Sequence, residues 1–258
     1  LWSGRVLRDE PDRIAAVHAA HLQAGADIIT SASYQLGADP VLMARSVAVA
    51  RRVCERYRPE ALVVGALGPY GACLADGSEY SGSYGVSQQV LETFHRQRLS
   101  LLQAAEPDLF AFETLPSLQE AKAVVAVLSQ QLDMSAWVSF TCKNDERVVS
   151  GDCFVECVAA VAACEQVVAV GVNCTAPRWV APLLLKARSV TDKPLVAYPN
   201  RGGRWDGVDK AWALPEQCHE WKPWVRQVWE AGAQIIGGCC QTTPEDIAVI
   251  CRACEGLV

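Results

Sequence analysis

The residues best suited to chemistry in this sequence are two adjacent cysteines, Cys239 and Cys240, which follow an apolar run and two glycines. Neighbouring residues on a strand point to opposite faces of a sheet. Both sulfurs therefore reach one site only if the chain leaves strand geometry, and Gly237 and Gly238 are predicted to give it that freedom. Two converging thiols are candidate metal ligands, and small core residues or a strained disulfide between neighbours are the alternatives.

A third cysteine, Cys174, ends another apolar run, Val168–Asn173. In a barrel of parallel strands the carboxyl ends of the strands lie on one face, and this would bring Cys174 to the cysteine pair. Three thiolates leave one position of a tetrahedral zinc shell open for substrate or water, as in catalytic zinc sites. We therefore predict that Cys174, Cys239 and Cys240 hold Zn²⁺ and form the catalytic centre.

Three further polar residues follow apolar runs and are candidate substrate contacts. Glu113 comes directly after Leu109–Phe112, and its carboxylate suits a cation, although a solvated loop acid is the alternative. Asn173 precedes a predicted metal ligand and could orient a substrate or shape the turn. Asn200 could bind a substrate carboxylate or make the turn that asparagine favours.

The elements that must position these residues alternate between short apolar, β-branched runs and segments of helix length. The predicted buried parallel strands are Ala26–Ser31, Ala61–Ala66, Asp108–Phe112, Ala136–Thr141, Val167–Val172, Pro194–Tyr198 and Gln234–Gly237. The predicted helices are Asp12–Ala24, Pro40–Tyr57, Ser87–Ala105, Ser117–Leu132, Cys153–Cys164, Trp179–Val190, Pro223–Glu230 and Pro244–Cys254.

This repeat predicts an α/β fold, a (β/α)₈ TIM barrel that lacks its first strand, because residues 1–11 contain no strand pattern. We expect one domain over residues 1–258, truncated at its N-terminus. A doubly wound open sheet is the alternative architecture. The barrel is favoured because reactive residues follow the ends of many different runs, where barrel active sites assemble.

Composition excludes several classes of function. The net charge of −6 is spread without a block of like charge, and this argues against nucleic acid as a partner. No apolar run reaches the roughly 18 residues that a membrane span requires. Twelve cysteines in 258 residues are too few for a disulfide scaffold and fit a reducing compartment. We expect a cytoplasmic monomer or homodimer that acts on small molecules away from membranes.

Several stretches resemble the homocysteine S-methyltransferase family, and together they cover nearly the whole chain. They are Leu1–Ser3, Ala24–Thr30, Ser33–Gln35, Gly65–Gly71, Gly77–Tyr80, Phe112–Pro116, Val172–Thr175, Tyr198–Asn200 and Gly237–Cys240. The separate Asn-Cys and Gly-Gly-Cys-Cys motifs are specific in combination. The Gly-Ser-Glu-Tyr stretch is most similar to the branch that contains S-methylmethionine-using and selenocysteine methyltransferases.

The resemblance implies that a homocysteine sulfur attacks the methyl group of a sulfonium donor, S-methylmethionine or S-adenosylmethionine, and that methionine is formed. It also implies zinc held by the three cysteines, and a contact between Glu113 and the homocysteine ammonium group. Tyr80, Trp205 and Trp212 are expected in loops, where their aromatic faces are candidate surfaces for the sulfonium, with packing or lid residues as the equal alternative. Selenocysteine as the acceptor, or a non-catalytic zinc-binding or redox-sensing barrel, are the alternatives.

Overall fold

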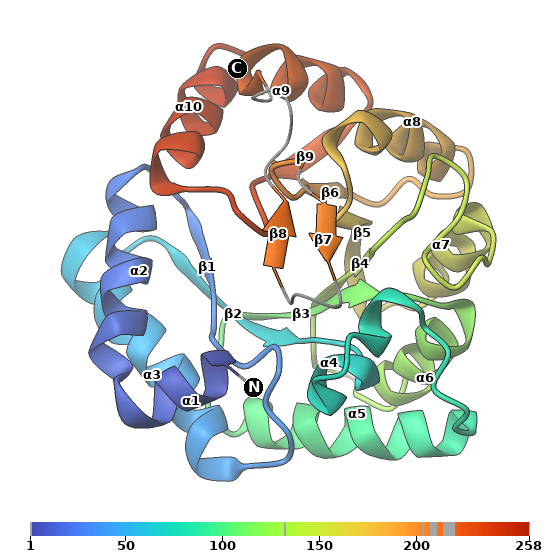
Figure 1. Cartoon of the computed structure of the whole chain (residues 1–258), viewed down its shortest axis with the longest axis horizontal. Helices are drawn as coiled ribbons and strands as arrows, with labels where there is room; N and C mark the ends of the chain where they lie inside the picture. The colour runs from blue at the N-terminus through green and yellow to red at the C-terminus, as the bar shows by residue number, and fades with distance from the viewer. Residues whose placement is uncertain (1, 132, 203, 207–210, 214–219, 258) are drawn as a thin grey trace.

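Seven parallel strands curl into an open barrel surrounded by helices (Figure 1). The computed structural model describes residues 2–131, 133–202, 204–206, 211–213 and 220–257. In sheet order the strands are β1 Ile28–Thr30, β2 Leu62–Leu67, β3 Leu109–Leu115, β4 Ala136–Phe140, β5 Val167–Asn173, β6 Leu195–Tyr198 and β9 Ala233–Ile236. Among the described residues, β1 and β9 therefore form the two edges of the sheet.

The order of the strands in the sheet decides between the two predicted architectures. A doubly wound sheet reverses its strand order part-way across, whereas here every strand pairs with the next of the seven, always in parallel. The sheet is thus wound in one direction, as in a barrel. The α/β barrel prediction is confirmed, and the doubly wound alternative is wrong.

Eight helices form the outer ring at the positions that the sequence predicted. They are α2 Pro11–Gln23, α3 Pro40–Tyr57, α5 Gln88–Gln103, α6 Leu118–Leu128, α7 Phe154–Ala162, α8 Pro177–Arg188, α9 Trp221–Glu230 and α10 Pro244–Glu255. The helix predicted over 117–132 ends at Leu128, and Leu132 lies outside the described residues. The ring brings α10 against the end of α2, where a Cβ on Gly25 would lie 3.3 Å from the Cys251 side chain.

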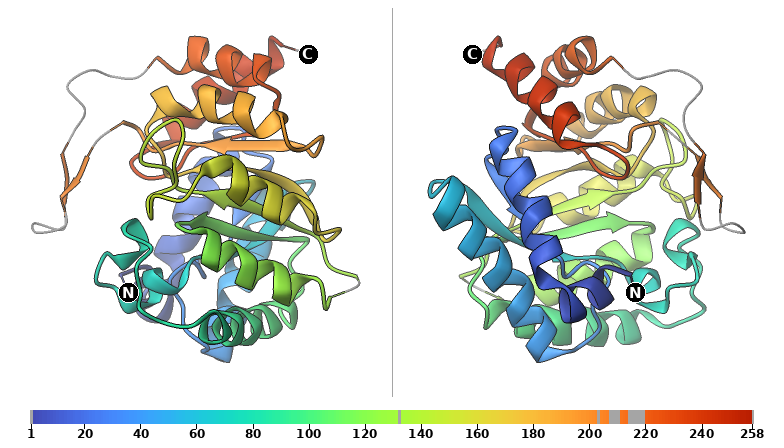
Figure 2. Two further views of the ribbon diagram at one scale, coloured as in Figure 1. Left: turned by 90° about the vertical axis from the view of Figure 1, so that its right-hand side faces the viewer. Right: turned by 60° about the vertical axis from the view of Figure 1, so that its left-hand side comes forward.

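Other elements were not predicted. Residues Trp2–Asp9 form helix α1, whose Leu7 is fully buried. Between β2 and α5 lie a short helix, α4 Tyr70–Leu74, and a 3₁₀ turn, η1 Ser78–Tyr80. Strands β7 Arg204–Asp206 and β8 Ala211–Ala213 form an antiparallel hairpin. Figure 2 shows α4 and this hairpin on the side of the barrel toward which the strand arrows point.

The hairpin corrects one expectation about Trp205 and Trp212. Both were expected in loops, but they lie on β7 and β8, where they are register partners. Their side chains lie outside the described residues, so their proposed contact with a sulfonium stays a prediction.

Alternate residues of the strands build two apolar layers. The inner layer comes from strands alone and consists of Val64, Ala111, Trp137, Ala169 and Val196. Residues at the intervening positions, such as Phe110 and Phe112 of β3, pack toward the helices instead. Because side chains alternate with a period of two, burial on both faces makes these strands apolar over most of their length, as in other parallel sheets.

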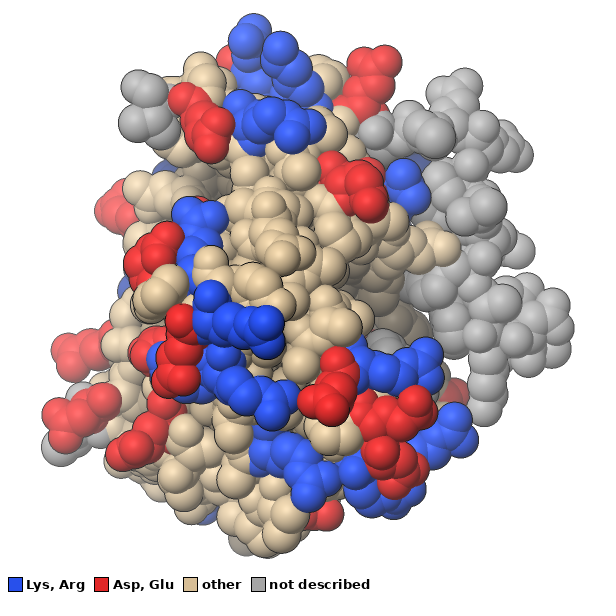
Figure 3. All heavy atoms as spheres, turned by 90° about the vertical axis from the view of Figure 1, so that its left-hand side faces the viewer, with Lys and Arg blue, Asp and Glu red and all other residues tan. Residues whose placement is uncertain are grey.

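The face that includes α2 and α3 carries basic and acidic side chains interspersed (Figure 3). Ion pairs connect neighbouring elements here: Arg52 with Asp12 at 3.2 Å and Arg51 with Asp108 at 2.8 Å. Charges of opposite sign are thus paired on this face, and each exposed pair adds little stability.

None of the helices among the described residues has the length and apolar character needed to cross a lipid bilayer.

The closest backbone approach in the sheet generates a stability prediction. A Cβ on Gly171 of β5 would lie 1.9 Å from the carbonyl oxygen of Val196 in β6. We expect Gly171→Ala to lower the free energy of unfolding by about 3 kcal/mol or more, since neighbouring strands must separate. Gly37→Ala is the control, because its Cβ would meet nothing within 4 Å. Urea unfolding measures both variants, and equal stabilities would contradict this reading.

Candidate functional site

Three cysteine sulfurs converge at the carboxyl end of the barrel. Cys174 directly follows β5, and Cys239 and Cys240 follow β9. The Sγ atoms of Cys174 and Cys240 are 3.5 Å apart, and all three Sγ atoms lie within 4.8 Å of one another. Among the described residues this is the one cluster of three or more cysteine, histidine or acidic side chains close enough to share a metal ion.

The end of β6 holds the two cysteine segments together, because β6 lies between β5 and β9 in the sheet. The Cys174 N–H donates to the carbonyl of Tyr198 at 3.1 Å, and the Cys239 N–H donates to the carbonyl of Pro199 at 2.7 Å. Two consecutive carbonyls on one segment thus fix both sides of the cluster. Cys174 has a left-handed backbone with φ of 48°, which turns its side chain away from a regular strand direction.

The glycines before the cysteine pair act differently from the prediction. Gly237 and Gly238 are not among the residues with positive φ. Gly238 is needed because a Cβ there would lie 2.5 Å from the hydroxyl oxygen of Thr242. That hydroxyl donates to the carbonyl of Cys239 at 2.6 Å, and Gln241 takes the left-handed backbone with φ of 67°. The sharp turn thus depends on close packing at Gly238 and on the left-handed Gln241.

The three thiols influence one another strongly. Hydrogen bonds from Cys174 and Cys239 lower the pKa of Cys240 to about 4. The pKa of Cys174 is raised, first by its hydrogen bonds with Cys239 and Cys240 and then by burial. The cluster therefore loses its first proton readily and its later protons with difficulty, since like charges gather in a desolvated place. A cation among the sulfurs would offset the charge that full ionisation brings together.

Glu113 lies on β3 with only 8% of its surface exposed. Its Oε2 accepts a hydrogen bond from the Tyr198 hydroxyl at 3.0 Å. Burial raises the pKa of Glu113 to about 8, the Cys239 thiolate adds to the rise, and the Tyr198 hydroxyl opposes it. The solvated-loop alternative does not describe this carboxyl group, which is poised to accept a cationic partner.

The side chain of Asn173 links neighbouring strands. Its Oδ1 accepts hydrogen bonds from the Thr114 N–H at 2.8 Å and the Ser139 hydroxyl at 2.9 Å, and its Nδ2 donates to the Thr114 hydroxyl at 2.7 Å. Thr114 has a positive φ of 64°, which this pairing supports. With 1% of its surface exposed, Asn173 is used to shape the strand ends. Of its two predicted uses, the geometry favours shaping the turn.

Asn200 lies beyond β6 with 7% of its surface exposed. Its N–H donates to the carbonyl of Thr175 at 3.2 Å, whereas its Oδ1 has no hydrogen-bond partner. This side chain retains capacity for a substrate. The next residue, Arg201, forms an ion pair with Asp246 at 3.2 Å, so its guanidinium is engaged at the start of α10.

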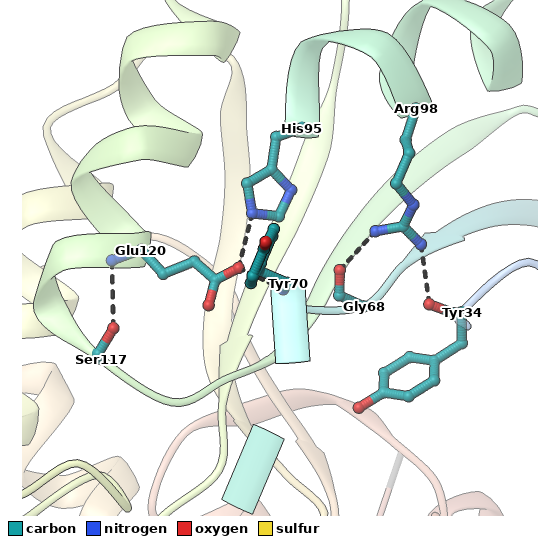
Figure 4. Close-up of polar contacts among 7 residues, drawn as sticks. All are labelled: Tyr34, Gly68, Tyr70, His95, Arg98, Ser117 and Glu120. Carbon is teal, nitrogen blue, oxygen red and sulfur yellow. Dashed lines mark hydrogen bonds and ion pairs between the residues drawn. The ribbon is translucent and has the colours of Figure 1, made fainter. Parts of the chain in front are cut away.

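A buried polar layer behind the site could not be assigned from the sequence (Figure 4). Arg98 of α5 is fully buried and donates to the carbonyls of Gly68 at 2.6 Å and Tyr34 at 2.8 Å. His95, one turn earlier, forms a hydrogen bond with Glu120 of α6 at 2.9 Å. The sequence offers one indication of this layer. His95 and Arg98 lie on the helix face that carries buried leucines, where polar side chains are rare.

Arg98 and Glu120 act on the loops that follow β1 and β2. Tyr34 belongs to the loop after β1, and Gly68 belongs to the loop after β2. Glu120 accepts a hydrogen bond from the N–H of Tyr70 at the start of α4, at 2.6 Å. Side chains of the outer helices therefore set the position of two loops beside the thiols.

A curled barrel of parallel strands with three converging thiols at its strand ends defines a class of α/β-barrel protein with a sulfur-rich candidate metal centre. The chain belongs to the homocysteine S-methyltransferase family, whose model matches residues 1–254. The family resemblance predicted from the sequence is confirmed. Members of this family transfer a methyl group to homocysteine.

Individual proteins agree with this assignment. The chain is 41% identical to homocysteine S-methyltransferase 3 of Zea mays, covering 98% of this chain and 83% of the maize protein. It is 39% identical to selenocysteine Se-methyltransferase of Brassica oleracea var. italica, with coverages of 97% and 81%. The metallated form of the Escherichia coli homocysteine methyltransferase MmuM matches with a TM-score of 0.86 and 38% identity, over 98% of this chain and 88% of that one.

The role of Asn173 yields a prediction. We expect Asn173→Ala to lower the free energy of unfolding by about 2 to 3 kcal/mol, because Thr114 and Ser139 lose buried partners. Asn144→Ala is the matched control: the Asn144 side chain also accepts two hydrogen bonds, from Glu146 and Arg147 N–H groups, but in an exposed loop. Thermal and urea unfolding measure the difference. A larger loss in the control would contradict this assignment.

Proposed function

We propose that this protein methylates the thiol of homocysteine with a sulfonium donor, producing methionine, and that Cys174, Cys239 and Cys240 hold Zn²⁺ for this reaction. The convergence of three sulfurs within 4.8 Å at the strand ends is the observation that carries the proposal. The homocysteine methyltransferases among its relatives, one of them in a metallated form, support it.

The donor set fits zinc. Thiolate sulfur is a preferred zinc ligand, and three protein ligands with one open position are typical of catalytic zinc sites. The raised pKa of Cys174 also agrees with a metal site. A divalent cation would offset the negative charge that opposes ionisation of this thiol. When bound there, zinc would favour the thiolate form of an incoming thiol, which is the nucleophilic form.

Glu113 and Asn200 are placed to bind the amino-acid part of homocysteine. The Glu113 carboxylate, with the Tyr198 hydroxyl on Oε2, would accept the ammonium group. The unpartnered Oδ1 of Asn200 shows that this amide has unused hydrogen-bonding capacity. Amide oxygen and nitrogen are interchangeable by rotation about the last side-chain bond, so Asn200 can also offer its NH₂ to the substrate carboxylate.

The reaction places few demands on acid or base groups. A bond forms between the homocysteine sulfur and the methyl carbon, while the bond between that carbon and the donor sulfur breaks. The electron pair of the broken bond stays on the donor sulfur, which leaves as a neutral thioether. Homocysteine loses its thiol proton to solvent before attack, so the two products are neutral thioethers and one proton is released. The remaining requirements are in-line alignment and exclusion of water, which fixed strand ends supply.

Selenocysteine is a second candidate acceptor. The chain is 39% identical to a selenocysteine Se-methyltransferase, close to its 41% identity with a homocysteine enzyme. A selenol ionises more readily than a thiol and would use the same amino-acid contacts. Competition between the two acceptors in one assay decides which is preferred.

The metal proposal predicts about one Zn²⁺ per reduced chain, measured by atomic absorption after dialysis. We expect Cys174→Ser, Cys239→Ser and Cys240→Ser each to lose most of the metal. Cys153→Ser is the control, since Cys153 lies at the start of α7 and outside the cluster. Full zinc retention by the Cys174 variant would overturn the assignment, and zinc binding without methionine formation would favour the non-catalytic alternative.

The substrate proposal predicts methionine formation from homocysteine and S-methylmethionine, with S-adenosylmethionine tested as a competing donor. Glu113→Gln is expected to raise the KM for homocysteine by about 10- to 100-fold, because a charge-assisted contact with the ammonium group is lost. Glu156→Gln, an exposed acid on α7, serves as the control. An unchanged homocysteine KM in the Glu113 variant would remove that residue from the binding site.

A further inference from the structure

The segment between β2 and α5 is packed firmly and carries a buried acid, Glu79. A Cβ on Gly71 of α4 would lie 2.4 Å from the Glu79 nitrogen and 2.6 Å from the Tyr84 ring, so α4 and η1 are in direct contact. Farther along, a Cβ on Gly82 would lie 3.1 Å from the side chain of Pro116. The position of Glu79 is therefore fixed by the packing of its backbone.

The Glu79 carboxyl group is buried without a charged partner. Only 7% of the residue is exposed, and its Oε2 has no hydrogen-bond partner. None of the ion pairs among the described residues includes Glu79. Burying a carboxylate without a cation costs several kcal/mol. An acid kept in this state is a candidate binding group for a cationic molecule.

Two tyrosines connect Glu79 with the thiols. After burial, the next largest cause of the raised pKa of both the Tyr34 and the Tyr80 hydroxyl is the thiolate of Cys174. Ionised Glu79 also raises the pKa of each hydroxyl. The Tyr34 ring packs on Gly68 directly after β2, where a Cβ would lie 2.6 Å from it, so Tyr34 lies at the strand ends. The Coulomb interactions of both hydroxyls agree with this position, because such interactions weaken with distance. Tyr34 is held there by the Arg98 contact shown in Figure 4.

We propose that Glu79 is the counter-ion for the sulfonium group of the methyl donor, and that the rings of Tyr34 and Tyr80 line the same binding site. This inference rests on the proposed function. A sulfonium carries a permanent positive charge that is poorly hydrated, and aromatic faces together with a carboxylate attract such a cation. In this proposal Glu113 binds the ammonium group of homocysteine, and Glu79 binds the sulfonium group of the donor.

This role has a distinct kinetic signature. The donor is cationic in the ground state, and its charge is partly neutralised in the transition state as the thiolate approaches. A counter-ion therefore strengthens donor binding without favouring the chemical step, so its loss raises KM and leaves kcat unchanged or higher. A residue with only a structural role would lower kcat and affect both substrates.

The first experiment compares Glu79→Gln with Asp76→Asn in the zinc-loaded full chain. Asp76 is an exposed acid of the same loop, and its Oδ1 accepts the Ser78 N–H, a contact that asparagine preserves. We expect the Glu79 variant to raise the KM for S-methylmethionine by about 10- to 100-fold. The KM for homocysteine, kcat and the zinc content should stay within about threefold. Asp76→Asn should match the unaltered protein.

The second experiment isolates the sulfonium group. Trimethylsulfonium has no ammonium or carboxylate group, and we expect it to compete with the donor and to bind Glu79→Gln about 10-fold or more weakly. The affinity for methionine, a neutral thioether analogue of S-methylmethionine, should be the same in both proteins. Unchanged trimethylsulfonium binding in the variant, or an equal loss of methionine binding, would overturn the inference.

Activity, donor binding and thermal unfolding together separate the proposed function from the proposed role of Glu79. If the unaltered protein forms no methionine from any donor, the proposed function fails. If it forms methionine and Glu79→Gln keeps its donor KM, the function stands and the role of Glu79 is rejected. The role of Glu79 would also be rejected if the variant unfolds at a lower temperature and loses as much affinity for homocysteine as for the methyl donor. That pattern is expected of a residue with only a structural role.

Discussion

The site depends on the meeting of three sulfurs from two strands that are not neighbours in the sheet. Cys174 follows β5, Cys239 and Cys240 follow β9, and β6 lies between these strands. The carbonyls of Tyr198 and Pro199 each accept a cysteine N–H, so backbone hydrogen bonds determine the separation of the sulfurs. Once one thiol of the cluster is ionised, its negative charge opposes ionisation of the other two. The sheet therefore maintains an arrangement that the side chains alone would not favour.

Two buried acidic side chains belong to the loops and strand ends at this mouth of the barrel. Glu113 and Glu79 are both buried, and burial is the largest cause of the raised pKa of each. In a weakly polar environment these groups attract cations more strongly than they would in water. The proposed reactants carry the complementary charges, an ammonium group on the acceptor and a sulfonium on the donor. Charge balance thus gives a physical reason for two buried acids at this mouth of the barrel.

The elements that carry the thiols were predictable because buried parallel strands are mostly apolar. Val167–Asn173 is apolar up to its last residue, and Ala233–Ile236 is apolar except for Gln234. The convergence of Cys174 with Cys239 and Cys240 followed from barrel geometry once the strand ends were known. Burial of Glu79 was not predictable, because its loop resembles an ordinary polar turn and its environment comes from distant contacts. Gly238 was predicted to supply backbone freedom, but its role is to allow close packing against Thr242. Such packing between side chain and backbone leaves no pattern in the sequence.

The contacts of Arg98 restrict which substitutions the loops after β1 and β2 can accept. One guanidinium holds carbonyls of Tyr34 and Gly68, which belong to successive loops at the mouth of the barrel. Displacing either loop would leave a buried cation short of acceptors, a cost of several kcal/mol. The positions of the two loops are therefore coupled through one guanidinium. Substitutions that reshape one of them must be accompanied by changes in the other, so this half of the mouth should evolve as a unit.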